Sequence, residues 1–226
     1  MTTNFEKTEK KRNILVVGSS GFIGSSLIKN LDTDRFNIYT AGRKEGDIII
    51  DFEKVDTISK LELEEQLKFD AVLFLQGINP SQGIFDIDYE HFQKMLNVHI
   101  VSPTLFIQKL HQNLNDNCLI LFMSSIAAKK GSYDPSYAAA KSALHGLVQS
   151  LANAFSSYRF NMLSLGLVEN SPVYNQMTPD FRERHSSRMY RQSFIKVENV
   201  ISMILELIDN DNINRVTIDI EGGYKV

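Results

Sequence analysis

The sequence predicts one α/β domain with a doubly wound, parallel seven-stranded β-sheet and helices on both faces. Short apolar runs rich in Val, Ile and Leu alternate with segments of helical periodicity along the chain, which is typical of buried parallel strands joined by crossover helices. No linker or internal repeat interrupts the alternation, and 226 residues suffice for one large domain but not for two of full size. We therefore expect a single domain over residues 13–226, after a flexible polar tail over residues 1–12.

The strands are predicted from apolar, often β-branched runs bounded by polar, Gly or Pro residues. They comprise residues 13–17, 36–40, 47–51, 71–75, 118–123, 160–167 and 217–220. Apolar residues three or four apart predict the helices, which comprise residues 25–31, 56–69, 89–110, 136–155 and 197–208. Pro103 has no N–H for the carbonyl of His99, so the helix over 89–110 should kink there. The polar stretch 168–194 is typical of a substrate-binding lid.

The composition is that of an ordinary globular protein, with 43% apolar and 23% charged residues. A net charge of −3 gives no reason to expect nucleic acid or an anionic membrane as partner. No apolar run approaches the roughly 20 residues that span a bilayer, and no apolar signal region opens the chain, so we expect a cytoplasmic protein. The single cysteine, Cys118, lies in an apolar run, which predicts a buried side chain and excludes a multi-cysteine metal site.

Three glycines spaced three residues apart separate the first strand from the first helix. Glycine here permits a tight turn, lets backbone N–H groups approach a pyrophosphate and allows the helix to pack closely on the strand. The spacing predicts a dinucleotide-binding turn, and a purely structural turn is the alternative. The residues expected to contact the cofactor in this turn are Gly18, Ser20, Gly21, Phe22, Ile23 and Gly24.

The second strand leads into Gly42, Arg43 and Lys44, where a dinucleotide fold meets the adenosine ribose. Gly42 offers no carboxylate to a 2′-hydroxyl, whereas Arg43 offers a planar fork of donors that suits a 2′-phosphate. This favours NADP(H) over NAD(H), with a solvated basic turn as the alternative. Asp51 ends the third strand and either hydrogen-bonds the adenine amino group or caps the next segment.

Tyr137 and Lys141 lie four residues apart in a strongly helical run, which places both on one helix face. An ammonium close to a phenol favours phenolate, so we expect Lys141 to lower the pKa of Tyr137 from its reference value of about 10. Such a phenol can exchange a proton with a substrate oxygen. The alternative is a tyrosine above a lysine on an exposed surface.

Two further polar features lie near the same predicted sheet edge. The pair Ser124-Ser125 ends a strand, where ligands bind in open α/β sheets, although serine is also common in turns and caps. Asn97 lies inside the helix over 89–110, where it either binds a water at the kink or is an exposed polar residue.

Together these motifs resemble the short-chain dehydrogenase/reductase family over residues 13–223, in order and in spacing. The residues that match the family's Tyr-x-x-x-Lys signature, its upstream serine and its helix asparagine are Tyr137, Lys141, the Ser124-Ser125 pair and Asn97. The sequence departs from the family's pattern where Gln76 follows the fourth strand, where Leu165 precedes Gly166, and where Asn170 replaces a threonine that helps to hold the nicotinamide. The glycine spacing resembles the family's extended branch, whereas the chain length resembles its shorter branch.

The resemblance implies a Rossmann-type fold and an NADP(H)-dependent oxidoreductase that transfers a hydride between the nicotinamide and a carbonyl or secondary alcohol. Ser125 would then bind the substrate carbonyl, Tyr137 would donate the proton, Lys141 would bind the nicotinamide ribose and Asn97 would hold a water that supplies protons through Lys141. Ser124 is the alternative to Ser125, because it precedes the tyrosine by the family's thirteen residues. The other cofactor contacts implied are Asp51, Phe52, Gln76, Gly77, Tyr137, Gly166 and Val168.

Two other functions stay open. The glycine spacing also suits a sugar or nucleotide-sugar epimerase or reductase of the surface-polysaccharide type, and a non-catalytic NADP-binding regulatory protein would share the fold. We expect a small-molecule substrate, no metal, no nucleic acid, no membrane, and a homodimer or homotetramer paired through the helices that carry Asn97 and Tyr137. Several arginines in the segment 168–194 suggest an anionic substrate or, as the alternative, a solvated charged face.

Overall fold

The computed structural model describes residues 10–224 and places seven parallel strands in one sheet, in the order β3-β2-β1-β4-β5-β6-β7. The strands are β1 (Arg12–Val17), β2 (Phe36–Gly42), β3 (Ile48–Ile49), β4 (Phe69–Phe74), β5 (Leu114–Ser125), β6 (Arg159–Leu165) and β7 (Thr217–Ile220). From β1 the sheet extends through β2 to β3 on one side, and the later strands β4 to β7 follow on the other side. The strand order therefore switches between β1 and β4, and ligands of doubly wound sheets bind in the crevice at such a switch point. The predicted Rossmann-type fold is confirmed.

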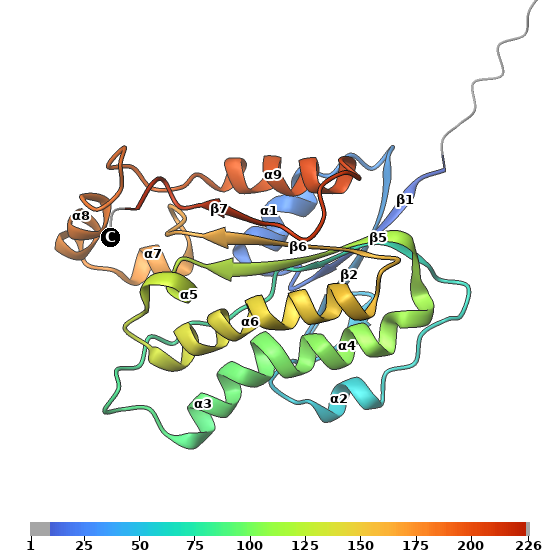
Figure 1. Cartoon of the computed structure of the whole chain (residues 1–226), viewed down its shortest axis with the longest axis horizontal. Helices are drawn as coiled ribbons and strands as arrows, with labels where there is room; N and C mark the ends of the chain where they lie inside the picture. Colours follow the sequence, from blue (N-terminus) through green and yellow to red (C-terminus); the bar gives the residue numbers. More distant parts are fainter. Residues whose placement is uncertain (1–9, 225–226) are drawn as a thin grey trace, which may run out of the picture.

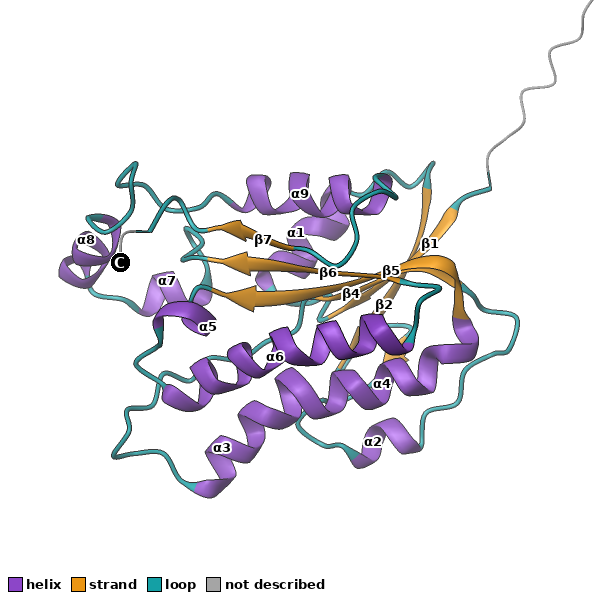
Figure 2. Ribbon diagram, viewed as in Figure 1, coloured by secondary structure: helices purple, strands orange, loops and turns teal. Residues whose placement is uncertain are grey.

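Helices cover both faces of the sheet. On one face lie α1 (Phe22–Asn30) and α9 (Val197–Asp209) (Figure 1). On the other lie α2 (Asp56–Ser59), α3 (Tyr89–Leu96), α4 (Ser102–Leu110) and α6 (Pro135–Ala154). The arrowheads of β5, β6 and β7 point toward α5 (Ala127–Lys130), α7 (Pro172–Gln176) and α8 (Pro179–Ser186) (Figure 2). These three short helices therefore surround the carboxyl edge of the sheet.

Strand β1 shows why the sheet has a core on each side. Leu15 and Val17 pack with α4 and α6, whereas Ile14 and Val16 pack with α1 and α9, and all four are essentially inaccessible to solvent. Successive side chains of a strand point to opposite faces. A run that is apolar at every position is therefore buried on both faces, as the β-branched pattern predicts.

Several predicted boundaries differ from those of the structure, and two of the differences have a clear physical reason. The first strand begins at Arg12, inside the expected tail. Its N–H donates to the carbonyl of Arg35, just before β2, and its guanidinium donates to the carbonyl of Ile208 in α9; residues 1–9 of that tail lie outside the described residues. The helix expected over 56–69 ends at Ser59. The Asn113 side chain donates hydrogen bonds to the carbonyls of Glu64 (2.9 Å) and Leu67 (2.7 Å), which holds this stretch in a non-helical conformation.

The helix expected over 89–110 is interrupted by η1 (Asn97–Val101), a turn of π-helix. The N–H of Ser102 donates to the carbonyl of Asn97, five residues back, and Pro103 cannot donate to the carbonyl of His99. The predicted disturbance is thus present as a π-helical turn, which rotates the side chains that follow it. A short 3₁₀ turn, η2 (His111–Asn113), ends this helical stretch.

The stretch 168–194 contains α7 and α8, and its role as a substrate-binding lid stays a prediction. Val168 forms a parallel bridge with Ile195, and Met189 forms an antiparallel bridge with Tyr224. Both ends of the stretch are thus joined to the domain by backbone pairing. Among the helices of residues 10–224, none combines the length and apolar character needed to cross a lipid bilayer.

Candidate active site

The glycine turn after β1 forms a cradle of bare backbone. Gly18 has φ +81°, a conformation that L side chains rarely adopt, and a Cβ there would lie 2.6 Å from the backbone nitrogen of Gln76. A Cβ on Gly24 would lie 2.3 Å from the carbonyl oxygen of Gly18. Only glycine fits either position without displacing backbone, so the turn, the loop after β4 and helix α1 meet without intervening side chains.

Helix α1 begins at this turn with free donors. Gly21 is its N-cap residue, and no side-chain cap satisfies the first N–H groups of this helix within the described structure. The first N–H groups of a helix have no intrahelical acceptor and bind anionic phosphate well. Ser20 and Gly21 are exposed here, while Phe22 and Ile23 are half-buried at the start of the helix. The cradle therefore fits the pyrophosphate of a dinucleotide.

The region predicted to meet the adenosine contains an ion pair. Arg43, just beyond β2, is exposed and pairs with Glu53 at 3.0 Å. The Asp51 carboxylate accepts the N–H of Glu53 at 3.1 Å within the loop. The N-cap residue of the next helix is Val55, so the predicted capping of that helix by Asp51 is wrong, and a contact with adenine stays a prediction. Phe52 is buried against Phe74 and Phe106.

The other loops predicted to contact the cofactor are closely packed. A Cβ on Gly77 would lie 3.4 Å from the ring of His99, and one on Gly166 would lie 3.0 Å from Ile195. Val168 is buried. The Oε1 atom of Gln76 is buried and has no partner among the described residues. A bound dinucleotide with exposed amide and hydroxyl donors would satisfy this orphaned acceptor, since buried polar groups are normally hydrogen-bonded.

Tyr137 and Lys141 lie on α6 as predicted, and Asp134 caps that helix by accepting the N–H of Tyr137 at 3.1 Å. The Lys141 ammonium lies 5.7 Å from the centre of the Tyr137 ring and donates to the carbonyl of Met123 at 2.6 Å. Lys141 is 4% exposed, and burial lowers its pKa from 10.5 to about 7. A lysine so placed exchanges its proton near neutral pH.

The predicted lowering of the Tyr137 pKa is wrong for the protein without cofactor. Burial raises the pKa of Tyr137, hydrogen bonding to Ser125 opposes this, and the negative charge of Asp134 adds to the rise. The free-energy cost of removing the phenolate from water therefore exceeds the stabilisation that it gains from Ser125. A phenol with a raised pKa stays protonated at neutral pH and can act as a proton donor.

The two serines at the end of β5 have different neighbours. The Ser125 side chain acts to lower the pKa of Tyr137, and its Oγ accepts the N–H of Ala127 at 3.2 Å. Ser124 is buried and its Oγ lies 3.0 Å from Nε2 of His145. Tyr137 and His145 both lie on α6, so the two serines face different turns of the same helix.

The structure does not bring the Asn97 side chain to Tyr137 and Lys141. Its amide donates to the carbonyl of Glu53 at 3.4 Å and accepts from Gln93 at 2.9 Å, away from the cluster. His99, two residues later on the π-helical turn, is there instead. Its ring meets that of Tyr137 edge-to-face, with centroids 5.6 Å apart, and Nε2 lies 3.1 Å from the carbonyl oxygen of Ile78.

The position of His99 decides its protonation. Burial lowers its pKa well below 6.5, and the nearby charge of Lys141 lowers it further, although the hydrogen bond to Ile78 acts in the opposite sense. A carbonyl only accepts, so Nε2 carries the proton and Nδ1 of the neutral ring is an acceptor. One feature of the sequence points to this residue. The carbonyl of His99 would accept a hydrogen bond from the N–H of residue 103, but Pro103 has no N–H.

The lid arginines mostly bind their own segment. Arg182 donates to the carbonyls of Tyr174 (3.0 Å) and Asn175 (3.3 Å) and lies over the Tyr174 ring. Arg188 donates to the hydroxyl of Tyr224 at 3.4 Å. These contacts favour the hypothesis that the arginines form a structural, partly solvated charged face. They do not favour a preformed binding site for an anionic substrate. Within residues 10–224 no group of three or more His, Cys, Asp or Glu side chains is placed to hold a metal ion.

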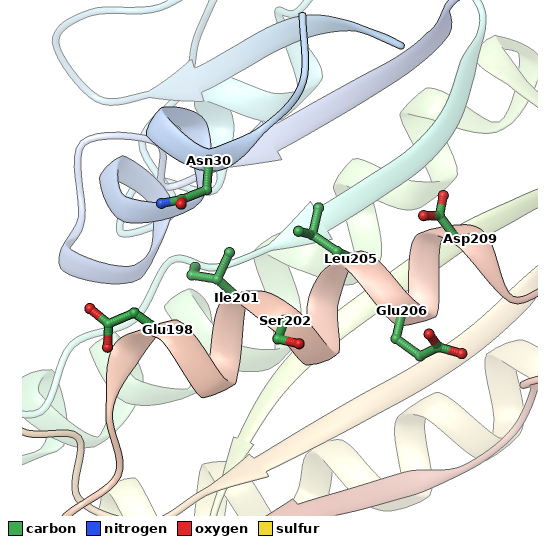
Figure 3. A pocket seen from close by; sticks show the side chains of 7 residues that line it. All are labelled: Asn30, Glu198, Ile201, Ser202, Leu205, Glu206 and Asp209. Carbon is green, nitrogen blue, oxygen red and sulfur yellow. The ribbon is translucent and has the colours of Figure 1, made fainter.

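A surface hollow of about 360 Å³ lies between α1 and α9, on the face of the sheet opposite α6 (Figure 3). Ile201 and Leu205 point toward α1, and Glu198, Glu206 and Asp209 line the hollow. Asp209 already pairs with Arg35 at 2.7 Å and with Arg12. The hollow is separate from the tyrosine cluster.

Comparison with known proteins agrees with this geometry. Residues 49–225 match a family model described as enoyl-(acyl carrier protein) reductase. An L-rhamnose 1-dehydrogenase (NADP(+)) of Thermoplasma acidophilum is 22% identical, with 86% of this chain and 84% of that protein covered. A short-chain dehydrogenase family protein of Francisella tularensis is 23% identical with a TM-score of 0.83, covering 95% of this chain and 99% of that one.

A small-chain dehydrogenase in complex with NADPH is 21% identical with a TM-score of 0.82, covering 95% of this chain and 98% of the other. The family match covers well over half of the chain, and the fold, the glycine cradle and the tyrosine–lysine helix agree with it. The chain therefore belongs to the short-chain dehydrogenase/reductase family and is an NAD(P)-dependent oxidoreductase.

Proposed function

We propose that this protein is an NADP(H)-dependent oxidoreductase that interconverts a carbonyl and a secondary alcohol, with Ser125, Tyr137, Lys141 and His99 as its proton-transfer group. One observation carries the proposal: these four side chains converge at the carboxyl edge of the sheet, next to the backbone cradle of the glycine turn. Ligands of doubly wound sheets bind at this edge.

When bound, the cofactor supplies or accepts the hydride. In the reductive direction the Ser125 hydroxyl donates a hydrogen bond to the substrate carbonyl oxygen, and the Tyr137 phenol gives that oxygen its proton. Lys141, whose pKa is about 7, returns a proton toward the phenolate and stabilises it. His99 accepts a hydrogen bond at Nδ1 from Lys141 or from a water between them, which is the role that the sequence suggested for Asn97.

The preference for NADP(H) over NAD(H) rests on Arg43. Its guanidinium lies beyond β2, where the adenosine ribose of a dinucleotide sits, and it suits a 2′-phosphate. Two relatives support this choice, since one is named an NADP(+) dehydrogenase and another was solved with NADPH. The rhamnose dehydrogenase also makes a sugar or a similar polyol the first substrate class to examine.

We also propose a homodimer or homotetramer that pairs through α3 and α6. Large side chains beside these helices are exposed in the single chain, including Phe85 (99%), Tyr89 (79%) and Tyr133 (72%). Exposed apolar side chains gathered in one region favour an interface.

The reaction is tested by following reduced nicotinamide during incubation with NADPH and a panel of aldoses, ketoses and keto acids, with the reverse reaction run on the matching alcohols. A comparison of the matched variants Ser125→Ala and Ser124→Ala shows which of the two serines takes part in the reaction. We expect Ser125→Ala to lower kcat by roughly 10–100-fold, because it removes one donor to the developing charge, and Ser124→Ala to keep most of it. The reverse ranking would contradict the assignment. Substrate turnover without net cofactor consumption would favour an epimerase.

The role of His99 is tested by His99→Phe, with Asn97→Ala as the comparison. Phenylalanine keeps the ring contact with Tyr137 but removes both nitrogens. We expect kcat to fall by roughly 10–100-fold and its pH dependence to change, since a proton-relay member is lost, while the KM for NADPH stays nearly constant. Asn97→Ala should retain near wild-type kcat. If Asn97→Ala is the more impaired variant, the relay runs through Asn97 and not through His99.

A further inference from the structure

Two cations from distant parts of the chain share one carboxylate beside the adenosine end of the site. Arg43, beyond β2, lies 3.0 Å from Oε1 of Glu53, and Lys94, in the last turn of α3, lies 2.9 Å from Oε2. Each oxygen of Glu53 thus has its own cation. A phosphate group presents oxygens to several donors in the same way.

Glu53 is held in this position by its backbone. Its N–H donates to the Asp51 carboxylate at 3.1 Å, and its carbonyl accepts from the Asn97 amide at 3.4 Å. Its side chain is 26% exposed, less than that of Arg43 (61%) or Lys94 (41%). The carboxylate is therefore the more fixed member of the trio, and the two cations are the members free to turn toward a ligand.

Two members of the trio, Glu53 and Lys94, line a shallow hollow of about 250 Å³. The residues that line it are Glu53, Tyr89, Glu90, Gln93, Lys94 and Asn97. Arg43 does not line this hollow and is linked to it through its ion pair with Glu53.

We propose that Lys94 is a second ligand of the cofactor 2′-phosphate, and that Glu53 is the internal counter-ion which this phosphate displaces. The inference rests on the proposed use of NADP(H). Two cations and one carboxylate leave a local charge of about +1, against a phosphate that carries nearly two negative charges near neutral pH. Glu53 thus weakens the binding of NADPH but not of NADH, and it sets how strongly the site distinguishes the two cofactors.

The test measures dissociation constants of NADPH and NADH by fluorescence titration, without turnover. We expect Glu53→Gln to tighten NADPH by roughly three- to tenfold at low salt and Lys94→Gln to weaken it by a similar factor, with the dissociation constant of NADH unchanged in both. Both changes should shrink as the salt concentration rises, because exposed charges are screened. Glu90→Gln is the matched control, since it removes the same charge from the same hollow without touching Arg43.

The outcomes separate this inference from the proposed function. If the wild-type protein binds neither cofactor, the proposed function fails. If Arg43→Ala weakens NADPH while Glu53→Gln and Lys94→Gln leave it unchanged, NADP(H) use stands and the counter-ion inference is overturned. If Glu90→Gln tightens NADPH as much as Glu53→Gln does, the effect is general electrostatics, and the specific role of Glu53 is likewise overturned.

Discussion

Replacing Tyr137 by phenylalanine is expected to reduce turnover by roughly 10²–10⁴-fold, the usual contribution of a positioned proton donor. The ring, its edge-to-face contact with His99 and the helix cap at its backbone N–H are all preserved. Only the hydroxyl is removed. NADPH affinity should therefore stay close to that of the wild type, because the glycine cradle and Arg43 are untouched.

The matched control is Tyr133→Phe, the same change in a neighbouring tyrosine that is 72% exposed. Steady-state rates, fluorescence titration with NADPH and thermal unfolding are to be measured for both variants. Full activity in Tyr137→Phe would remove this residue from the mechanism. A loss of cofactor binding equal to the loss of rate would make its role one of binding.

Replacing Asp134 by alanine is expected to lower the free energy of unfolding by about 2–4 kcal/mol. The carboxylate is fully buried and accepts the N–H of Tyr137, the hydroxyl of Ser136 and the N–H of Gln82, and it lies 2.8 Å from Nε2 of His91. Alanine removes the cap of α6 and leaves these donors without an acceptor. Urea unfolding measures the loss, and Asp134→Asn, which keeps one cap oxygen, should lose less.

The same variant tests a pH effect. Burial alone would raise the pKa of Asp134, but the hydrogen bonds from Ser136, Tyr137, His91 and Gln82 outweigh it, and the pKa is lowered. The unfolded chain then takes up the proton more readily than the folded one. The carboxylate thus contributes its stability above about pH 4 and loses it as the pH falls toward its folded value. Asp134→Ala should flatten the acid side of the stability curve, and an unchanged slope would contradict this account.

The strands and the glycine turn follow from short stretches of sequence. The run over 13–17 is apolar at nearly every position, which suits only burial on both faces, and glycine is required at Gly18 and Gly24 because any side chain would meet backbone. The spacing of Tyr137 and Lys141 places them on one helix face in any regular helix. The fold and the centre of the candidate site could therefore be predicted from local patterns alone.

The remaining features depend on residues far apart in the chain. A π-helical turn places His99 rather than Asn97 beside Tyr137, and such a turn shifts side chains in a way that helical periodicity does not encode. Asn113 holds Glu64 and Leu67 in a non-helical stretch that apolar spacing alone predicts as helix. The pKa of Tyr137 reflects the water excluded by the packed domain, and Glu53 meets both Arg43 and Lys94 only after folding. Local sequence thus determined the strands, the glycine turn and the residue types of the site. Tertiary packing decided which side chains meet and how strongly they are dehydrated, because both depend on contacts between distant segments.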